Sequence, residues 1–136
     1  MNVTVTGNLC ADPELRHTPG NVPVADLRIA ENRYSKDPDG EWRTDTAFFA
    51  VVCWRDLATH AAESLHRGDR VVAVGRLRQD TWTTDTGEKR SRYVIDADDL
   101  AASIRFAKVE VTKTSRPQEP EGPVTYDPDD PARPFE

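Results

Sequence analysis

The chain has 136 residues and a net charge of −6, and 37% of its residues are hydrophobic while 31% are charged. This size and composition fit one small domain with a polar appendage. No apolar run approaches the roughly 20 residues that a membrane-spanning helix needs, and the first residues do not resemble a signal peptide, so we expect a cytoplasmic protein.

Two strands and a hairpin loop are predicted in the first part of the chain. Residues 2–9 alternate apolar and polar side chains, which is typical of a half-buried strand. A second strand is expected over residues 22–34, with Leu27 and Ile29 facing one side. Residues 37–40, Asp-Pro-Asp-Gly, predict a hairpin loop, because proline presets one turn dihedral and glycine allows positive φ.

A buried strand followed by a helix is predicted next. Residues 47–54 are nearly all apolar, so we expect this third strand to be buried on both faces. The helix is expected over residues 57–66, with Asp56 as its N-cap and Gly68 as the C′ residue that follows it.

The rest of the chain predicts three more strands and a tail. The fourth and fifth strands are expected at residues 70–80 and 90–98, joined by a long hairpin with its turn at residues 85–87. Residues 104–112 alternate again and predict an extra strand outside the main sheet. From residue 113 onward the chain holds six of its ten prolines, so we expect this part to be disordered.

The predicted order is three strands, one helix and two strands. This order matches the OB-fold, a mainly β five-stranded Greek-key barrel with one helix between strands 3 and 4. Other small β-barrels also carry a single helix, so the order alone leaves them as alternatives. We assign residues 1–111 to an OB-fold domain that includes the extra C-terminal strand, and residues 112–136 to a disordered, Pro-rich acidic tail.

Charge is distributed unevenly along the chain. Residues 1–111 carry 15 Lys and Arg against 18 Asp and Glu, whereas residues 112–136 carry 3 against 6. Within residues 67–92 there are seven basic side chains against four acidic ones. A local basic stretch can bind a phosphate backbone even when the whole chain is acidic. The net charge therefore does not exclude a nucleic-acid-binding protein.

The sequence lacks the motifs of an enzyme. Of its histidines, His17, His60 and His66, the last two lie about 120° apart on the predicted helix, which suits joint metal ligation poorly. There is no P-loop, nucleophile elbow, HExxH motif or glycine-rich dinucleotide turn. Cys10 and Cys53 lie 43 positions apart without CxxC spacing. We therefore expect no catalysis, no metal and no cofactor.

Four aromatic residues are placed where they could stack on nucleic-acid bases. Tyr34 ends the second strand, Phe48 and Trp54 lie six residues apart on the third, and Trp82 begins the long hairpin. Stacking contributes roughly 1–3 kcal/mol per base and tolerates any sequence. Phe48 and Trp54 could equally be buried in the core, because their strand is apolar. Packing or subunit contacts are the interpretation for four other aromatics: Trp42, Phe49, Tyr93 and Phe106.

Two motifs are particularly characteristic, GNLCADPELR at residues 7–16 and LHRGDRVVAVGRL at residues 65–77, together with the stretch DTAFFAVVCWRDL between them. On these residues the sequence resembles the bacterial single-stranded DNA-binding protein family, over about residues 1–111. The resemblance implies an OB-fold, a homotetramer built as a dimer of dimers, and sequence-independent wrapping of single-stranded DNA during replication, repair and recombination.

The resemblance also implies roles for individual residues. The family's base-stacking aromatics fall at four positions: Tyr34, Phe48, Trp54 and Trp82. The first two stand where familiar members have Trp, which should weaken stacking. Basic family positions match Arg67 and Arg78, and we expect further phosphate contacts from Arg55, Arg76, Lys89, Arg90 and Arg92. Ala50, Asp56 and Thr81 stand where a basic residue is common, so affinity or its salt dependence should be reduced.

Subunit contacts are a further implication of the resemblance. Residues 104–113 look like an additional strand that some members use to clamp a neighbouring subunit. We expect the subunit interface at Val3, Val5, Phe49, Phe106 and Val109. Cys10 follows the first strand, which in family oligomers lies near the subunit dyad, so a disulfide between two copies is an alternative to a free thiol there.

The tail departs most from the family pattern. Family members usually end in a Gly-rich linker and an acidic tip closing with Ile-Pro-Phe, which docks genome-maintenance proteins. Four residues of such a tip are retained here: Asp129, Asp130, Pro134 and Phe135. Arg133 intrudes between them, and Glu136 moves the terminal carboxylate one residue further. These changes argue against docking in the family's manner and favour a specialised paralogue.

Two alternative functions fit the same fold. A protein-interaction OB module would bury its aromatics in subunit contacts and show no tryptophan quenching by oligo(dT). An RNA-binding OB domain would bind RNA more tightly than DNA of equal length. Our interpretation is a non-catalytic, nucleoid-associated protein that binds and protects single-stranded DNA.

Overall fold

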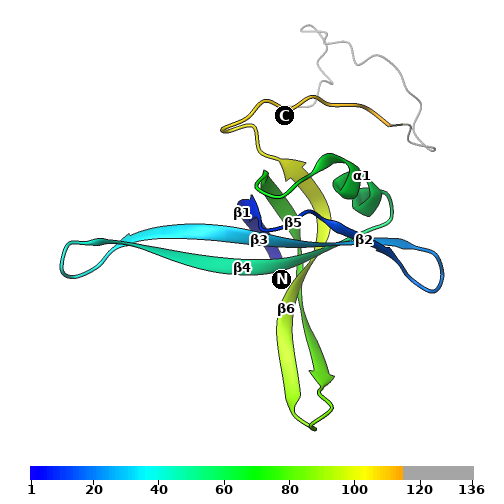
Figure 1. The fold of residues 1–136 in the computed structure, drawn as a ribbon, viewed down its shortest axis with the longest axis horizontal. Coiled ribbons are helices and arrows are strands. Elements are labelled where there is room, and N and C mark those ends of the chain that lie inside the picture. The colour runs from blue at the N-terminus through cyan, green and yellow to red at the C-terminus, as the bar shows by residue number, and fades with distance from the viewer. Residues whose placement is uncertain (115–136) are drawn as a thin grey trace, which may run out of the picture.

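A computed structural model of the protein describes residues 1–114 (Figure 1). Its elements are β1 (Asn2–Leu9), β2 (Glu14–His17), β3 (Pro23–Lys36), β4 (Trp42–Trp54), α1 (Asp56–Ser64), β5 (Arg70–Thr83) and β6 (Lys89–Ala102). Nearly all of the predicted tail, with the docking residues expected at 129–135, lies outside the described residues. Within the described part of the chain, no helix is long and apolar enough to cross a membrane.

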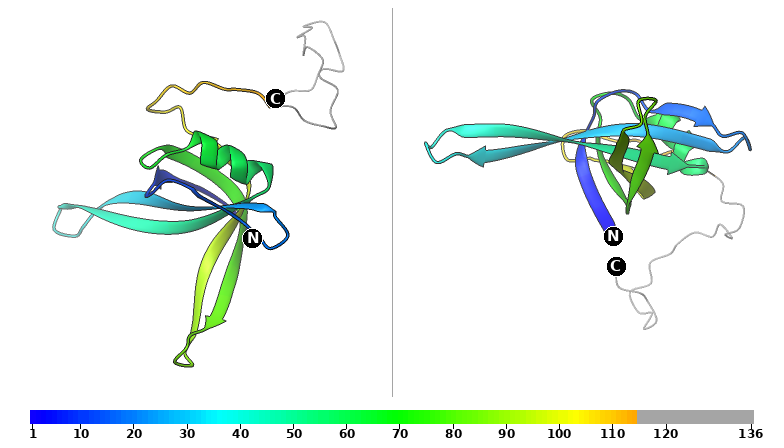
Figure 2. Two further views of the ribbon diagram at one scale, coloured as in Figure 1. Left: turned by 45° about the vertical axis from the view of Figure 1, so that its right-hand side comes forward. Right: turned by 90° about the horizontal axis from the view of Figure 1, so that it is seen from below.

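The strands β1, β3, β4, β5 and β6 close into a barrel. β1 pairs antiparallel with both β5 and β3, and β6 lies between β5 and β4, running parallel to β4. The short β2 pairs with β3 outside the barrel. α1 connects β4 to β5 and covers one end of the barrel (Figures 1 and 2). The predicted OB-fold is confirmed, with its helix between the third and fourth barrel strands.

The interior of the barrel is filled by alternate side chains of its strands. Leu27 and Ile29 of β3 are buried, as the period-2 pattern predicts. They belong to one core cluster with other apolar residues of the barrel strands, the helix and its C-cap: Val5, Leu9, Ala25, Val51, Cys53, Ala58, Ala61, Leu65, Val71, Ala73 and Ile95. This core fixes which side chains of each strand point outward.

Two hairpins extend beyond the barrel as arms. Residues 31–47 form the β3–β4 arm and residues 78–93 form the β5–β6 arm, and the two leave the barrel in different directions (Figures 1 and 2). Most side chains on both faces of the two arms are exposed or half-buried. The arms therefore add little to the core and a large amount of accessible sheet surface.

The helix begins and ends differently from the prediction. Asp56 is its first residue and not its cap; the N-cap position is Arg55, which has φ 60° and makes no capping side-chain hydrogen bond. The Arg55 N–H is already donated to the Pro23 carbonyl at the end of the β3–β4 ladder, at 2.8 Å, so the chain turns one residue earlier. At the other end, Leu65 is the C-cap in an extended conformation, and Gly68, with φ 92°, lies in the turn that follows.

The extra strand predicted over residues 104–112 is not formed in this structure. β6 instead continues to Ala102, and residues 103–114 belong to no strand. A strand needs a neighbour with free backbone groups, and residues 103–114 pair with none of the strands of this chain. The apolar side chains of Ile104, Phe106 and Val111 are consequently exposed.

Candidate nucleic-acid interface

The register of the β3–β4 ladder places three predicted aromatics on one face. Tyr34 pairs with Thr44, while Phe48 and Trp54 lie opposite Ala30 and Val24. The intervening pairs, such as Leu27 with Val51, point into the core. Because successive side chains of a strand alternate, the even-numbered residues of both strands point away from the core. We call this surface, continued over β6 and β5, the outer face.

The β5–β6 ladder continues the outer face. Ala50 of β4 lies beside Val94 of β6, and Val94 lies opposite Arg78 of β5. Further along the same pair of strands, Asp80 is opposite Arg92, and Trp82 is opposite Arg90. The fourth predicted aromatic is therefore on the same face as the other three.

The middle of the outer face is apolar. Val24, Val52 and Val94 are buried together there, with Ala50 packed against them, separate from the barrel core. This second cluster explains why residues 47–54 of β4 are nearly all apolar: Val51 and Cys53 fill the barrel, while Val52 lies under the opposite surface. The prediction that this strand is buried on both faces is correct for residues 51–53 and wrong at its ends.

All four predicted stacking residues are exposed. The exposed fraction is 71% for Tyr34, 55% for Phe48, 41% for Trp54 and 43% for Trp82. Within this chain, the alternative that Phe48 and Trp54 are core residues is therefore wrong. Trp42, near the tip of the β3–β4 arm, is also on an even-numbered position and is 73% exposed, so it does not pack within this chain, and a subunit contact stays a prediction.

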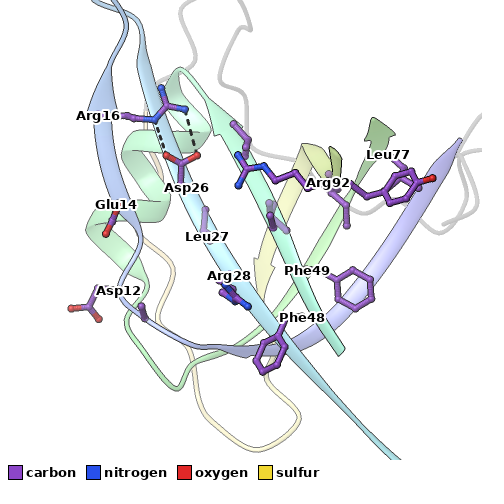
Figure 3. A pocket seen from close by; sticks show the side chains of 16 residues that line it. Asp12, Glu14, Arg16, Asp26, Leu27, Arg28, Phe48, Phe49, Leu77 and Arg92 are labelled. Carbon is purple, nitrogen blue, oxygen red and sulfur yellow. Dashed lines mark hydrogen bonds and ion pairs between the residues drawn. The ribbon is translucent and has the colours of Figure 1, made fainter. Parts of the chain in front are cut away.

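An open groove of about 1020 Å³ runs over β3 and β4 (Figure 3). Its walls include Arg16 and Asp26, which form an ion pair with 2.7 Å between Nε and Oδ2. Deeper along the groove, the guanidinium of Arg28 lies over the ring of Phe48, 4.8 Å from its centroid. A smaller hollow of about 380 Å³ on the other arm is lined by Asp80, Thr81, Trp82 and Arg92. Tyr34 and Trp54 lie outside these two hollows.

Sequence reasoning missed Arg28 as a member of this surface. The signal was present, since Leu27 and Ile29 were assigned to the inner side and a period-2 strand must turn Arg28 outward. Arg28 has no ion-pair partner among the described residues. Its charge is therefore available to a ligand in the groove, and its plane extends the aromatic surface of Phe48.

The arginines of the β5–β6 arm are all paired with carboxylates. Arg78 donates from Nε to Asp96 at 2.6 Å and also from Nη1 to Asp80. The same Asp80 carboxylate lies 3.9 Å from Nε of Arg92. Two longer pairs flank this cluster: Arg76 with Asp98 at 3.7 Å, and Arg90 with Glu88 at 3.3 Å. Four of the seven basic residues counted in residues 67–92 are thus paired with acids within the fold.

Three other basic residues that were predicted to contact phosphates lie outside this cluster of ion pairs. Lys89 pairs with Thr83 at an odd-numbered position, on the face opposite to Trp82. Arg55 follows Trp54 directly at the end of β4 and is exposed. Arg67 lies in the loop before β5, where its backbone N–H donates to Asp12, a residue of the groove wall, at 2.8 Å.

The predicted interface residues also separate into groups. Val5 is buried in the core of its own chain, and its place in a subunit interface stays a prediction. Val3 and Phe49 are half-buried and pack against that core. Phe106 and Val109 are exposed, and the Phe106 ring lies beneath the guanidinium of Arg105, 4.9 Å away.

The pKa values of two side chains near the groove are shifted from their usual values. Burial raises the pKa of the Cys53 thiol to about 12, and the nearby charge of Asp26 adds to the shift. The hydrogen bond to Asp26 raises the pKa of Arg16, so this guanidinium keeps its charge. Cys10 and Cys53 are both free thiols. Among residues 1–114, no group of three or more His, Cys, Asp or Glu is arranged to hold a metal ion.

Comparison with known proteins points to nucleic-acid binders. A family model described as "Single-strand binding protein family" matches residues 1–103. A Single-stranded DNA-binding protein from Corynebacterium glutamicum is 44% identical over 117 residues, which are 85% of this chain and 52% of that protein. One of the same name from Mycolicibacterium smegmatis is 44% identical over 84% of this chain and 70% of its own length. The chain thus spans about half the length of the first relative.

Solved structures show the same architecture. A Plasmodium falciparum SSB complex with ssDNA superposes with a TM-score of 0.70 at 20% identity, covering 75% of this chain and 93% of that chain, a likeness of fold alone. A small single-stranded DNA-binding protein from Streptomyces coelicolor superposes with a TM-score of 0.64 at 31% identity, covering 76% of this chain and 94% of the other.

Proposed function

Because the chain belongs to the single-strand binding protein family, we propose that it binds single-stranded DNA without sequence preference and without catalysis. Bases stack on Tyr34, Phe48, Trp54 and Trp82. Phosphates contact the arginine side chains that lie between these rings on the outer face. Stacking on a π-face needs no base-specific hydrogen bond, so every base is accepted.

The observation that supports this proposal best is the shared face of the four aromatics. The ladder registers turn all four away from the core, and each is more than two-fifths exposed. A folded domain gains nothing in its own stability from leaving such rings in water, because burial of apolar surface is favourable. Flat, exposed rings spaced along a sheet, with guanidinium groups between them, suit a flexible strand whose bases are unpaired.

Assembly and cellular role are part of the same proposal. The chain acts as a homotetramer, a dimer of dimers, that protects single-stranded DNA during replication, repair and recombination at the nucleoid. Exposed Phe106, Val109 and Val111 support this, because these side chains would be covered if residues 104–113 joined a neighbouring copy. Partner docking through the altered tip around Phe135 is not part of the proposal.

A titration of tryptophan fluorescence with oligo(dT) tests the proposal, because two of the stacking residues are Trp54 and Trp82. Binding should quench the emission strongly at low salt and less at high salt, since phosphate contacts release counterions. Trp54→Phe should retain most of the affinity measured with labelled oligo(dT), and Trp54→Ala should lose it, because only the first keeps an aromatic ring at residue 54.

Two outcomes would point elsewhere. An absence of quenching at low salt would contradict DNA binding and favour a protein-interaction module. Tighter binding of oligo(U) than of oligo(dT) at equal length would favour an RNA-binding domain, since the 2′-hydroxyl is what distinguishes the two strands.

A further inference from the structure

The carboxylate of Asp80 lies between two arginines of the outer face. It accepts a hydrogen bond from Nη1 of Arg78, and its other oxygen lies 3.9 Å from Nε of Arg92. Asp80 and Arg92 are direct partners across the β5–β6 ladder, so the backbone register holds the acid in this place. One anionic group with two oxygens thus lies where two guanidinium groups converge.

The same carboxylate lies beside a stacking residue. Asp80 and Arg92 line the hollow of about 380 Å³ that also contains Trp82, two residues further along β5. A nucleotide whose base stacks on the ring of Trp82 would bring its phosphate toward these guanidinium groups. Arginine binds carboxylate and phosphate through the same pairs of N–H donors.

We propose that Asp80 is an intramolecular substitute for a DNA phosphate, which holds Arg78 and Arg92 in the free protein and is displaced from them when the strand binds. This inference rests on the proposed binding of single-stranded DNA. Exchange is inexpensive, because the side chains of Asp80, Arg78 and Arg92 are 35%, 38% and 59% exposed, and exposed ion pairs contribute only about 0–1 kcal/mol. Arg78 keeps its 2.6 Å bond to Asp96, so it stays in position when Asp80 leaves.

The exchange has a consequence for salt dependence. When an unpaired arginine binds a phosphate, a counterion leaves the DNA, and the logarithm of affinity falls with the logarithm of salt by about 0.7 per contact for single strands. When the arginine first leaves Asp80, the freed carboxylate attracts a cation from solution and offsets that release. Asp80 therefore lowers both the affinity for DNA and its dependence on salt.

The test compares variants by anisotropy of fluorescein-labelled oligo(dT) over a range of NaCl concentrations. Asp80→Asn should lower the Kd by roughly two- to fivefold at low salt and make the salt slope steeper. Asp80→Glu keeps the charge and should bind like wild type. Glu63→Gln changes the net charge equally but lies on α1, away from the outer face, and should also bind like wild type.

Circular dichroism melting of each variant verifies that it is folded. An unchanged or higher Kd for Asp80→Asn would overturn the inference, since the acid would then be neutral or would help to orient the arginines. An equal gain in Glu63→Gln would also overturn it, because net charge alone would explain the effect. Failure of the proposed function is distinguishable, because wild type itself would then not bind oligo(dT).

Discussion

The β3–β4 arm and the β5–β6 arm are capped by turns of similar construction, yet their outer faces differ. Asp37 and Thr84 each start a turn that a glycine with positive φ completes, Gly40 at 85° and Gly87 at 84°. On the β3–β4 ladder, where the first arm joins the barrel, the outer face carries the ring of Phe48 and Arg28, which has no carboxylate partner in the described chain. On the second arm, one tryptophan lies beside arginines that are all held by acids. From this comparison we expect stacking to dominate on the β3–β4 ladder and charge exchange on the β5–β6 arm.

The ladders differ in regularity as well. The β3–β4 ladder runs from Val24 to Lys36 without a register shift, whereas β5–β6 shifts between Val74 and Gly75. A Cβ on Gly75 would collide with the backbone carbonyl of Asp96. A bulge bends a strand and increases its twist, so this position helps to direct the β5–β6 arm away from the barrel.

Gly75→Ala is the substitution with the largest expected effect. It should lower the free energy of unfolding by about 1–3 kcal/mol, because the clash is with backbone and cannot be relieved by a rotamer change. Urea unfolding followed by circular dichroism measures it. Gly20→Ala is the matched control, since its added methyl would meet only the Thr18 hydroxyl at 3.8 Å. Equal stability of Gly75→Ala and wild type would show that the bulge is not sterically required.

Phe48→Ala should have the largest effect on binding among substitutions on the β3–β4 ladder. It should weaken binding of oligo(dT) by about 1–3 kcal/mol, the contribution of one stacked base. Phe48→Leu retains apolar surface but loses the π-face, and should be nearly as weak. If the leucine variant bound like wild type, the contact would be hydrophobic and not aromatic stacking. Anisotropy of labelled oligo(dT) distinguishes the two results.

Arg28→Gln and Arg92→Gln compare the β3–β4 ladder and the β5–β6 arm directly. Arg28 has no carboxylate to leave, so its loss should remove close to the full salt slope of one contact, about 0.7 for a single strand. Arg92 must first leave Asp80, so its loss should change affinity and slope less. The measurement is the Kd of oligo(dT) at several salt concentrations. A larger effect from Arg92→Gln would contradict the proposed difference in charge pairing between the β3–β4 ladder and the β5–β6 arm.

The smallest expected effect concerns thiol reactivity. Cys53 is fully buried with a pKa of about 12, and the thiolate is the reactive form, so it should react with a thiol reagent at pH 8 only on unfolding. Cys10 is half-buried and should react in the folded protein. Mass spectrometry after timed labelling, with urea-unfolded protein as the control, locates the modified residue. Labelling of Cys53 as fast as Cys10 would contradict the tight packing of β4.

The barrel and its outward-pointing aromatics could be predicted because period-2 alternation fixes the two faces of a strand. Leu27 and Ile29 point inward in the structure as the pattern requires, and Phe48 and Trp54 share a face because six is an even separation. The short β2 could not be predicted, because all four of its side chains are exposed and it carries no alternation. Only its pairing with β3 defines it.

The ion pairs of the β5–β6 arm could not be predicted either, because they depend on how the two strands pair. The count of seven basic residues against four acidic ones in residues 67–92 suggested free positive charge. Asp96 and Asp98, which pair with Arg78 and Arg76, lie outside that range and reach them only across the β5–β6 ladder. The prediction of a strand over residues 104–112 failed in the opposite way, since its alternation is real but the segment pairs with no strand of its own chain.

The path of DNA across the outer face is tested most directly by photocross-linking. Oligo(dT) in which some thymines are replaced by 5-bromouracil is irradiated with the protein, and cross-linked peptides are identified by mass spectrometry. Cross-links should occur at Tyr34, Phe48, Trp54 and Trp82, on both ladders, because a stacked base lies against each ring. Cross-links confined to α1 or to Phe106, with none on the outer face, would contradict the proposed binding surface.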